Sequence, residues 1–600
     1  MKDFLSIFGF VSPKSYNAVN TNGSNVHNET TESIDLQQRR RSKRSGSVVV
    51  NRFFHETVLL EKRRHSRCAV FLMLMGVLAI GTGSFILLAD PYDMLLKWKL
   101  TLSDGGETYE IWRKPSADLV LRVYLFNITN KDEFLSGKEK LKVQEVGPYV
   151  YRENLEHANV TFNDNGTLNS IPKHPLVWAP ELSNGTEEDL LILPNIALLS
   201  IASVVKDKSY FTRLGMNLLI RQTDSHPLVE MTAKEFMFGY ETALTTLGNT
   251  VLPSWIFFDK IGLIARMYDF NGDTSTVYTG ETDVRKSGLF ETYRGSKHLP
   301  HWYRNREECS RVSSVDGASD ATKFPSLIQP DDNITMFRKS LCRTMPMEKV
   351  GEAVMDGFTV YNYTWKEGIL DNGLYNPENK CFCREGHCLP EGLIDVADCY
   401  YGFPIALSYP HFYKADPKLV EDVEGSFPNK EKHETRFLIN PVAGLPINLD
   451  VRMQINMAFG DISAISRVGR FSHMVLPMLW TEISLAKLPD DLLTKFNIYL
   501  NITPVFFSAM VYVTLICGPL LLIGSIMRVF CKTWEERRDT DIEGDMNYSK
   551  KHMKYINTDG KSSLKNKEVD MYFSSLLMPR SGSSPRDTIV RCPPADVDIV

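Results

Sequence analysis

Residues 68–89 read CAVFLMLMGVLAIGTGSFILLA and residues 503–527 read TPVFFSAMVYVTLICGPLLLIGSIM, and neither stretch contains a charged side chain. At 1.5 Å of rise per residue, a helix over either stretch crosses the roughly 30 Å hydrocarbon layer of a bilayer. The alternative is a buried core helix, but a soluble helix of this length normally keeps a polar stripe. We therefore predict transmembrane helices at 68–89 and 503–527. A cleaved signal peptide fits the first stretch poorly, because it begins so far into the chain.

Basic residues flank the two apolar stretches unequally. The outer flanks carry Arg39, Arg40, Arg41, Lys43, Arg44, Arg52, Lys62, Arg63, Arg64, Arg67, Arg528, Lys532, Arg537 and Arg538, whereas the flanks that face each other carry only Lys97, Lys99, Lys487 and Lys495. The positive-inside rule therefore predicts that both termini are cytoplasmic. We expect flexible polar tails at 1–67 and 528–600, and one large exoplasmic domain at 90–502.

The predicted exoplasmic domain contains acceptor sequences for N-glycosylation, Asn-X-Ser/Thr. They begin at Asn127, Asn159, Asn165, Asn184, Asn333 and Asn362. Asn501 also matches, but it lies so close to the second apolar stretch that its use is doubtful. Matches at Asn22, Asn28 and Asn547 fall in the predicted cytoplasmic tails, where no glycan would be added.

Six of the ten cysteines lie in one part of this domain, at Cys309, Cys342, Cys381, Cys383, Cys388 and Cys399. An even number of cysteines in an oxidising compartment indicates disulfides, and six cysteines allow fifteen pairings among which the sequence alone does not choose. A zinc site is the alternative, but the spacing lacks paired C-x2-C knuckles. We therefore predict three disulfides.

Two further features concern the cytoplasmic side. Cys68 and Cys531 lie at the edges of the predicted spans, where palmitoylation is common, although both are equally well explained as small apolar residues. The chain ends in Asp598-Ile599-Val600, an acidic-x-aliphatic terminus of the kind that adds as a strand to a cytosolic peptide-binding module. The alternative is that these three residues match the pattern by chance.

Charge and motifs argue against several functional classes. The net charge of −5 argues against nucleic acid as a partner. The sequence contains no H-E-x-x-H zinc helix, no G-x-S-x-G elbow and no G-x4-G-K-S/T phosphate loop. His411 is a conspicuous lone histidine, and a packed structural role is favoured over a catalytic one. We predict no catalytic residue, no metal and no cofactor.

The exoplasmic domain contains clear strand patterns. Apolar and polar residues alternate over 447–457, which predicts a strand with one buried and one wet face. Residues 119–126 predict a more fully buried strand. Residues 160–171 predict a hairpin that turns at Asn165-Gly166, where positive φ is tolerated.

One part of the domain is predicted to be helical. Apolar residues recur at helical spacing within 193–222 and 233–247, and Phe211, Leu214, Leu218 and Leu219 mark the second of three expected helices. Pro194 suits the start of the first helix and Gly248 the end of the third.

Several motifs occur in a combined order that resembles the class B scavenger receptors. They are GPYVY at 147–151, the cysteine order C…C…C-x-C-x4-C…C, YPHF at 409–412, NPVAG at 440–444 and PMLW at 477–480. The match covers about residues 68 to 530, which leaves out the long tails. This family includes a fatty-acid translocase, a high-density-lipoprotein receptor, a lysosomal integral membrane protein and insect sensory neuron membrane proteins.

The resemblance implies an α+β fold. Two transmembrane helices would flank an irregular antiparallel β-barrel that is capped by a helical-bundle apex, at about 193–247, and pierced by a hydrophobic lipid tunnel. It also implies the disulfide pairs Cys309–Cys381, Cys342–Cys399 and Cys383–Cys388. Ligands would engage the apex, with lipid moving through the tunnel toward the bilayer.

The apex departs from the family pattern at an informative position. Fatty-acid-binding members carry a lysine just after the second apex helix, where alignment on MNLLI (216–220) and FGY (238–240) places Gln222 in this chain. The basic residues that could bind a ligand instead are Lys206, Lys208, Arg213 and Arg221, although a charged helix face is often only a solvated one. Free fatty acid as the ligand is therefore doubtful.

Two functional hypotheses follow from the resemblance. The first is a glycoprotein receptor at the plasma membrane that binds lipids or lipoprotein-like particles and passes lipid through its tunnel. The second is a trafficking or cell-recognition receptor whose apex binds a protein, with residence at endosomal or lysosomal membranes as an alternative. A membrane-tethered enzyme is a third possibility without positive evidence.

Overall fold

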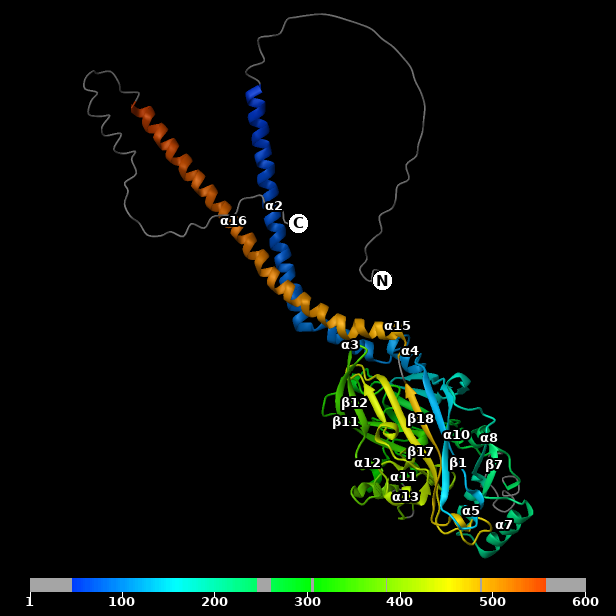
Figure 1. The fold of residues 1–600 in the computed structure, drawn as a ribbon. Helices are drawn as coiled ribbons and strands as arrows, with labels where there is room; N and C mark the ends of the chain where they lie inside the picture. The colour runs from blue at the N-terminus through cyan, green and yellow to red at the C-terminus, as the bar shows by residue number, and fades with distance from the viewer. Residues whose placement is uncertain (1–45, 245–259, 304–306, 385, 486–487, 557–600) are drawn as a thin grey trace, which may run out of the picture. The chain divides into compact units, whose positions relative to one another are not determined.

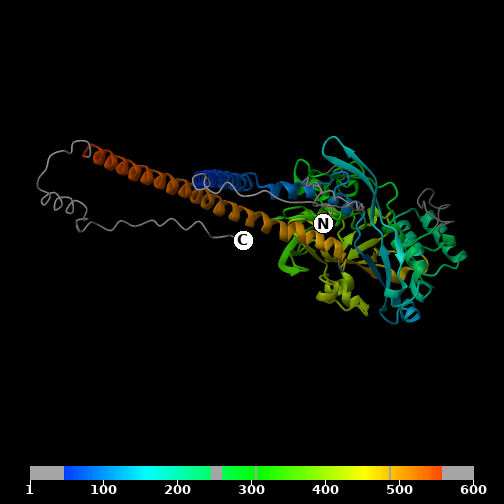
Figure 2. The ribbon, with the colours of Figure 1, turned by 90° about the horizontal axis from the view of Figure 1, so that it is seen from above.

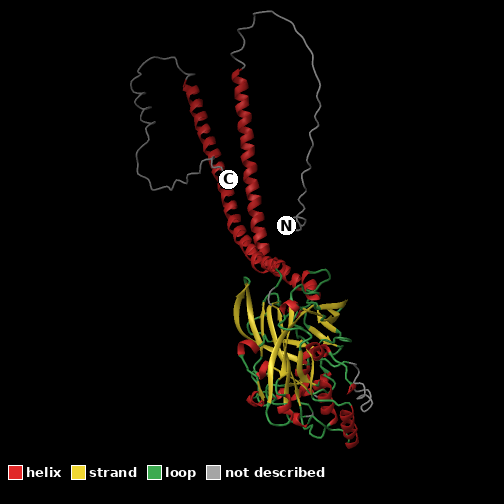
Figure 3. Cartoon of the chain, turned by 45° about the vertical axis from the view of Figure 1, so that its right-hand side comes forward, coloured by secondary structure: helices red, strands yellow, loops and turns green. Residues whose placement is uncertain are grey.

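The computed structural model describes residues 46–244, 260–303, 307–384, 386–485 and 488–556. The chain forms two units, one comprising Ala79–Ile516 and the other comprising Met1–Leu78 together with Cys517–Val600. The strands gather in the first unit, with short helices around them (Figure 3).

The main sheet of this unit is antiparallel except at one edge, where β15 runs parallel to β2. Along the sheet (Figure 1) the strands follow in the order β10 (Ile334–Arg338), β11 (Arg343–Met355), β12 (Phe358–Trp365), β16 (Arg436–Ile439), β17 (Pro446–Ala458), β18 (Val475–Leu485), β1 (Leu119–Ile128), β2 (Leu141–Glu153) and β15 (Val423–Glu424). Off this path, β14 (Ile405–Ser408) pairs with β17 and with β13 (Ile394–Asp395), and β5 (Leu176–Trp178) pairs with β2.

The antiparallel core is as the resemblance implies, but the expected closed barrel is not present. Within the described residues, the two edge strands β10 and β15 do not pair with each other. The outer edge of β10 instead forms a single bridge between Met336 and Ser319, and β15 is only two residues long. The sheet is therefore open.

Smaller elements complete this unit. A second sheet has the order β3 (Glu156–Asn163), β4 (Thr167–Lys173), β8 (Ser275–Tyr278) and β9 (Phe290–Tyr293), and β6 (Leu190–Pro194) pairs with β7 (Leu228–Thr232). The short helices outside the apex are α3 (Pro91–Leu100), α4 (Glu107–Arg113), α5 (Lys131–Leu135), α10 (Leu263–Met267), α11 (Pro300–Tyr303), α12 (Ser310–Ser313), α13 (Pro417–Asp422), α14 (Lys430–His433) and α15 (Asp490–Phe496).

The three strand predictions are confirmed. The alternating segment is β17, the buried segment is β1, and the hairpin is β3–β4, whose turn contains Gly166 at φ 73°. One detail of β17 differs, because Gln454 and Asn456 on the expected wet face are fully buried. β14 pairs with this end of β17, and Asn456 donates a hydrogen bond to Ser408 Oγ at 3.0 Å.

The apex helices are shorter than predicted. They are α6 (Ile196–Val205), α7 (Tyr210–Gln222) and α8 (Ala233–Phe238). Pro194 ends β6 rather than starting a helix, and Asn195 caps α6 instead, because its side chain accepts a hydrogen bond from Leu198 N. α8 ends at Phe238, since Gly239 has φ 118°, and the predicted end at Gly248 lies outside the described residues.

The two apolar stretches lie in long helices. They are α2 (Gly46–Ala89) and α16 (Thr503–Ile556), and α16 follows α15 through a π-helical turn at Asn497–Ile502. Both are long and apolar enough to cross a membrane, and their apolar side chains are largely exposed, unlike those of a soluble core helix. α16, drawn orange to red in Figure 2, continues through Pro519. Both helices extend into segments predicted to be flexible tails, at 46–67 and 528–556.

Within the unit that contains Cys517–Val600, the two long helices are in direct contact. Ser525 Oγ donates a hydrogen bond to the carbonyl oxygen of Ala69 at 2.7 Å. A Cβ atom added to Gly76 would lie 2.9 Å from Leu522 Cγ, so glycine allows the close approach.

Candidate functional site

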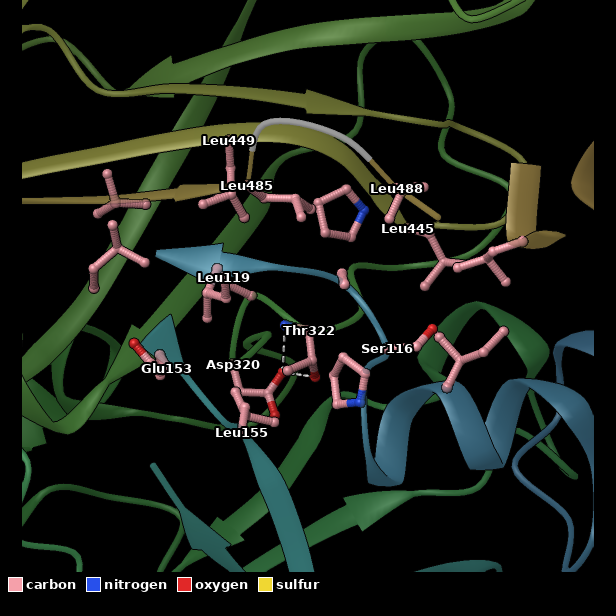
Figure 4. Close-up of a pocket in the computed structure, with 18 of the residues that line it drawn as sticks. Ser116, Leu119, Glu153, Leu155, Asp320, Thr322, Leu445, Leu449, Leu485 and Leu488 are labelled. Atoms are coloured by element: carbon pink, nitrogen blue, oxygen red, sulfur yellow. Dashed lines mark hydrogen bonds between the residues drawn. The ribbon is translucent and has the colours of Figure 1, made fainter. Parts of the chain in front are cut away.

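An apolar cavity lies between the ends of β1, β17 and β18 and the helix α15 (Figure 4). Leucine is the most frequent residue in its walls, at Leu119, Leu155, Leu445, Leu449, Leu485, Leu488 and Leu492. The cavity itself has a volume of about 80 Å³ and is partly open to solvent. Small-molecule sites in proteins typically occupy about 300–1,000 Å³, so a lipid chain would fit here only if the lining side chains moved apart.

Two further cavities continue from the first toward the apex. The second shares Arg338, Val451 and Ile483 with the first. The third shares Met267 with the second and reaches Ile196, the first residue of α6. The three cavities therefore share walls in series, although they do not form one continuous tunnel.

β17 provides the wall that joins the first two cavities. Leu449 and Val451 line the first, and Val451, Met453 and Ile455 line the second. These residues alternate along the strand, so their side chains point to the same face of the sheet. The apolar face that the alternating pattern predicts is therefore a cavity wall as well as a core surface.

A buried ionic cluster lies where the first two cavities meet. Arg338 borders both cavities, and its Nη2 atom lies 2.9 Å from Glu153 Oε1. Glu153 also accepts a hydrogen bond from Tyr268 Oη at 3.0 Å and lies 2.5 Å from His174 Nδ1. The Glu153 side chain is completely buried. No sequence motif indicated this cluster.

Burial and charge act in opposite directions within the cluster. Burial alone would raise the pKa of Glu153, but the Arg338 charge and the hydrogen bonds from His174 and Arg338 outweigh it and lower this pKa to about 2. Burial, together with the Glu153 charge, raises the pKa of Tyr268 well above its usual value. Glu153 and Arg338 therefore form a stable ion pair across the physiological pH range.

Asp320, which also borders the first cavity, belongs to a neighbouring pair. His157 Nε2 lies 3.0 Å from Asp320 Oδ2, and His157 Nδ1 lies 2.8 Å from the carbonyl oxygen of Trp112. Burial would raise the pKa of Asp320, but the contact with His157 lowers it. The first cavity is thus lined mostly by apolar side chains, and the two carboxylates that border it, Glu153 and Asp320, are both paired.

The predicted basic residues of the apex do not form a cluster free of other contacts. Lys206 Nζ lies 3.9 Å from Asp207 Oδ2, and Arg213 Nη1 lies 3.4 Å from the carbonyl oxygen of Lys206. Lys208, Arg221 and Gln222 are exposed.

The exposed apolar surface of α7 was not expected. Phe211, Leu214 and Leu218, which mark this helix in the sequence, are exposed together with Tyr210, and Phe211 is 79% exposed. Met216 and Ile220 are the buried residues of α7. The apolar spacing therefore predicted the helix correctly, but three of the four residues that mark it are exposed rather than buried.

The six clustered cysteines form three disulfides in the structure. They join Cys309 to Cys381, Cys342 to Cys399 and Cys383 to Cys388, which are the pairs that the resemblance implies. No thiolate of this group remains for zinc. Outside the group, Cys68 is exposed and free, whereas Cys531 is disulfide-bonded, so acylation at Cys531 is not proposed.

The glycosylation acceptors differ in accessibility. Asn159, Asn165, Asn184 and Asn333 are exposed. Asn127 and Asn362 are half-buried, and Asn127 Oδ1 accepts a hydrogen bond from Ile192 N. The Asn501 amide nitrogen, where a glycan would attach, donates to Gly357 O and to Asn497 Oδ1.

His411 is packed and hydrogen-bonded. Its Nδ1 accepts a hydrogen bond from Phe427 N at 3.1 Å, so Nε2 carries the hydrogen and donates to Glu145 Oε2 at 2.6 Å. Its ring stacks on His433 with centroids 4.6 Å apart. These contacts account for His411 without a catalytic role.

His433 makes the unfolding free energy depend on pH. Burial and the nearby His411, Arg452 and Lys432 outweigh the Glu145 charge and lower the pKa of His433 to about 4. As pH falls below about 6.5, His433 becomes protonated in the unfolded chain but stays neutral in the folded chain. The free energy of unfolding therefore falls between about pH 6.5 and pH 4, by up to about 3 kcal/mol. We expect His433→Gln to reduce the fall in melting temperature over this pH range. His226→Gln, at an exposed site, is the control and should leave this fall unchanged. An equal fall in melting temperature in the wild type and in both variants would contradict the assignment to His433.

An antiparallel β unit with three disulfides, apolar internal cavities and two flanking apolar helices has the organisation of a membrane scavenger receptor. The family model described as "CD36 family" matches residues 70–529, and the chain belongs to this family. It is 32% identical to scavenger receptor class B member 1 of Cricetulus griseus over 463 residues, which cover 76% of this chain and 89% of that protein.

The chain is also similar to two proteins that are not named as scavenger receptors. The chain is 27% identical to Protein peste of Drosophila melanogaster over 71% of its own length and 76% of that protein. It is 29% identical to lysosome membrane protein 2 of Homo sapiens over 68% of its own length and 84% of that protein.

Proposed function

We propose that this receptor binds lipids or lipoprotein-like particles at its apex and passes lipid through its interior toward the bilayer. The observation that supports this most directly is the series of apolar cavities with shared walls, from α6 to α15. Exposing a lipid chain to water costs about 0.8 kcal/mol per methylene, so an apolar passage lowers the barrier to transfer without any catalytic residue.

The break between the first two cavities lies at Arg338 and the wall residues Val451 and Ile483. A lipid that moves from one cavity to the next must pass these side chains. Because Arg338 is paired with Glu153, the passage carries no unpaired charge at this point, which suits neutral lipids such as sterol esters better than free fatty acids.

Replacing Val451 by tryptophan tests the passage. A lipid that passes the shared wall must displace the new indole, which adds about 1–3 kcal/mol to the barrier to lipid transfer. Lipid uptake should therefore fall about tenfold, whereas particle binding should be retained. The measurement is uptake and surface binding of lipoprotein carrying a fluorescent sterol ester, in cells with equal surface receptor. Val177→Trp, at an exposed site on β5, is the control. Normal uptake by Val451→Trp would contradict the proposal.

A second candidate function is docking of a protein at the apex. The exposed apolar residues of α7, Tyr210, Phe211, Leu214 and Leu218, favour a ligand with an apolar surface of its own, which a protein can also provide. In the same experiment, a receptor that only docks a protein would take up no sterol ester above untransfected cells. Endosomal localisation together with a coprecipitating protein would support this candidate.

The proposal also covers membrane topology, glycosylation and the cytoplasmic residues. We place residues 90–502 outside the cytoplasm or in an endolysosomal lumen and both termini inside, with glycans most accessible at Asn159, Asn165, Asn184 and Asn333. The exposed thiol of Cys68 is the proposed palmitoylation site. The C-terminal residues 598–600, which lie outside the described residues, are proposed to bind a cytosolic peptide-binding module.

A further inference from the structure

The helix α3 follows directly on the apolar stretch of α2. Asp90 has φ 39° and caps α3 by accepting a hydrogen bond from Asp93 N, so the chain turns at this residue. One side of α3 is buried through Leu96 and Leu100. Its other side exposes Met94, at 64%, and Trp98, at 63%.

The buried side of α3 connects this helix to the first cavity. Leu96 and Leu100 belong to a small cluster with Leu445, and Phe496 packs against that cluster. Leu445 and Phe496 also line the first cavity. α3 is therefore held at the end of the domain where this cavity lies.

The hairpin between β11 and β12 reaches the same end of the domain. It turns at Asp356 and Gly357, and Gly357 O accepts a hydrogen bond from Asn501 Nδ2 at 3.0 Å. Since α16 begins at Thr503, the tip of the hairpin lies beside the start of this helix.

Near the hairpin tip, two exposed valines lie beside the exposed charged side chains of Glu352 and Asp356. Val350 is 56% exposed and Val354 is 77% exposed. The nearby Glu352 carboxylate is paired with Lys349 Nζ at 2.6 Å, which offsets its charge. No contact within the described part of the molecule covers either valine.

We propose that α3 and the β11–β12 hairpin form a surface that lies in the outer bilayer leaflet. The surface consists of Met94, Trp98, Val350 and Val354. Its position at the ends of both apolar helices argues for lipid rather than protein as its occupant, because a bilayer around α2 and α16 must pass beside it. Tryptophan is enriched at the interfaces of membranes, and Trp98 is 63% exposed on this surface.

This inference goes beyond the proposed lipid passage and does not depend on it. Membrane contact through Met94, Trp98, Val350 and Val354 would also fit a receptor that only docks proteins. If lipid does pass, the surface would place the cavity lined by Leu445 and Phe496 next to the acyl chains.

The test uses the full-length chain in nanodiscs, with every cysteine outside the three disulfides of the Ala79–Ile516 unit, namely Cys68, Cys517, Cys531 and Cys592, replaced by serine. Val354→Cys or Met94→Cys is labelled with an environment-sensitive fluorophore, and the nanodisc lipid carries a nitroxide near the headgroup. Interfacial side chains lie about 5–10 Å into the headgroup boundary, so we expect about twofold quenching at both positions.

Phe211→Cys is the matched control, because Phe211 is equally exposed and apolar but lies in α7, at the opposite end of the Ala79–Ile516 unit from α3 (Figure 1). It should be quenched by aqueous iodide and not by the nitroxide lipid. Iodide quenching at both test positions as strong as at position 211 would overturn the proposal. Protection from iodide without quenching by the lipid would also overturn it, because a protein would then cover the surface. Met94→Cys carries the test if Val354→Cys fails to fold.

Discussion

Replacing Glu153 by leucine is expected to destabilise the protein by about 3–5 kcal/mol, since removal of one partner leaves a buried charge uncompensated. Arg338 would lose its carboxylate partner, with only 13% of its side chain exposed to water. Tyr268 and His174 would lose the oxygen atoms that they contact. The measurement is the melting temperature of the purified full-length protein at a fixed scan rate, which matters where unfolding is irreversible.

The neighbouring residue supplies the control for this prediction. Arg152 forms ion pairs with Asp118 and Glu181 at the surface, so Arg152→Ala should cost less than about 1 kcal/mol. The double variant Glu153→Leu/Arg338→Met should recover much of the loss, because it removes both charges together. With Arg338→Met alone measured as the second single variant, a loss in the double variant equal to the sum of the two single losses would contradict the ionic origin of the effect.

Replacing Cys342 by serine is expected to cost about 4 kcal/mol and to hold the protein in the secretory pathway. Its disulfide with Cys399 closes a loop of 57 residues, and in the chain-entropy model a loop of this length stabilises by about that amount. Cys399→Ser should behave in the same way, because each variant leaves a partner thiol unpaired. The measurement is the fraction of receptor at the cell surface, with glycan maturation as a second readout.

The short disulfide provides an internal comparison. Cys383 and Cys388 are five residues apart, so the same model gives only about 2 kcal/mol for their bond. Cys388→Ser should therefore reach the surface better than Cys342→Ser. Equal delivery of both variants at the wild-type level would show that the long-range disulfide is dispensable for folding.

Local patterns predicted the elements of this protein well. The apolar stretches at 68–89 and 503–527 lie in long helices, and alternation over 447–457 predicted β17. Such patterns work because helix and strand periodicities depend on neighbours a few residues apart. The boundaries were less accurate, since Asn195 starts α6 through a side-chain hydrogen bond and Gly239 ends α8 through its positive φ, and apolar spacing records neither.

The candidate site was only partly accessible from the sequence. The apolar residues of β17 were identified, but nothing in their spacing says whether they border a filled core or a cavity. The apex residues Phe211 and Leu218 marked a helix correctly, but their exposure could not be predicted, because a period shows which residues share a side of a helix and not what covers that side. The closed barrel came from resemblance alone, and the open edges at β10 and β15 correct it.

The sequence by itself determined the two apolar helices, the family, the strands β1 and β17 and the β3–β4 hairpin, because each is recorded in contiguous residues or in a fixed order of motifs. Only the tertiary structure brought Glu153 to Arg338, which are 185 positions apart, and placed this pair between two cavities that share Val451. A contact over that distance depends on how β2, β10 and β17 pack together, and no local pattern records this packing.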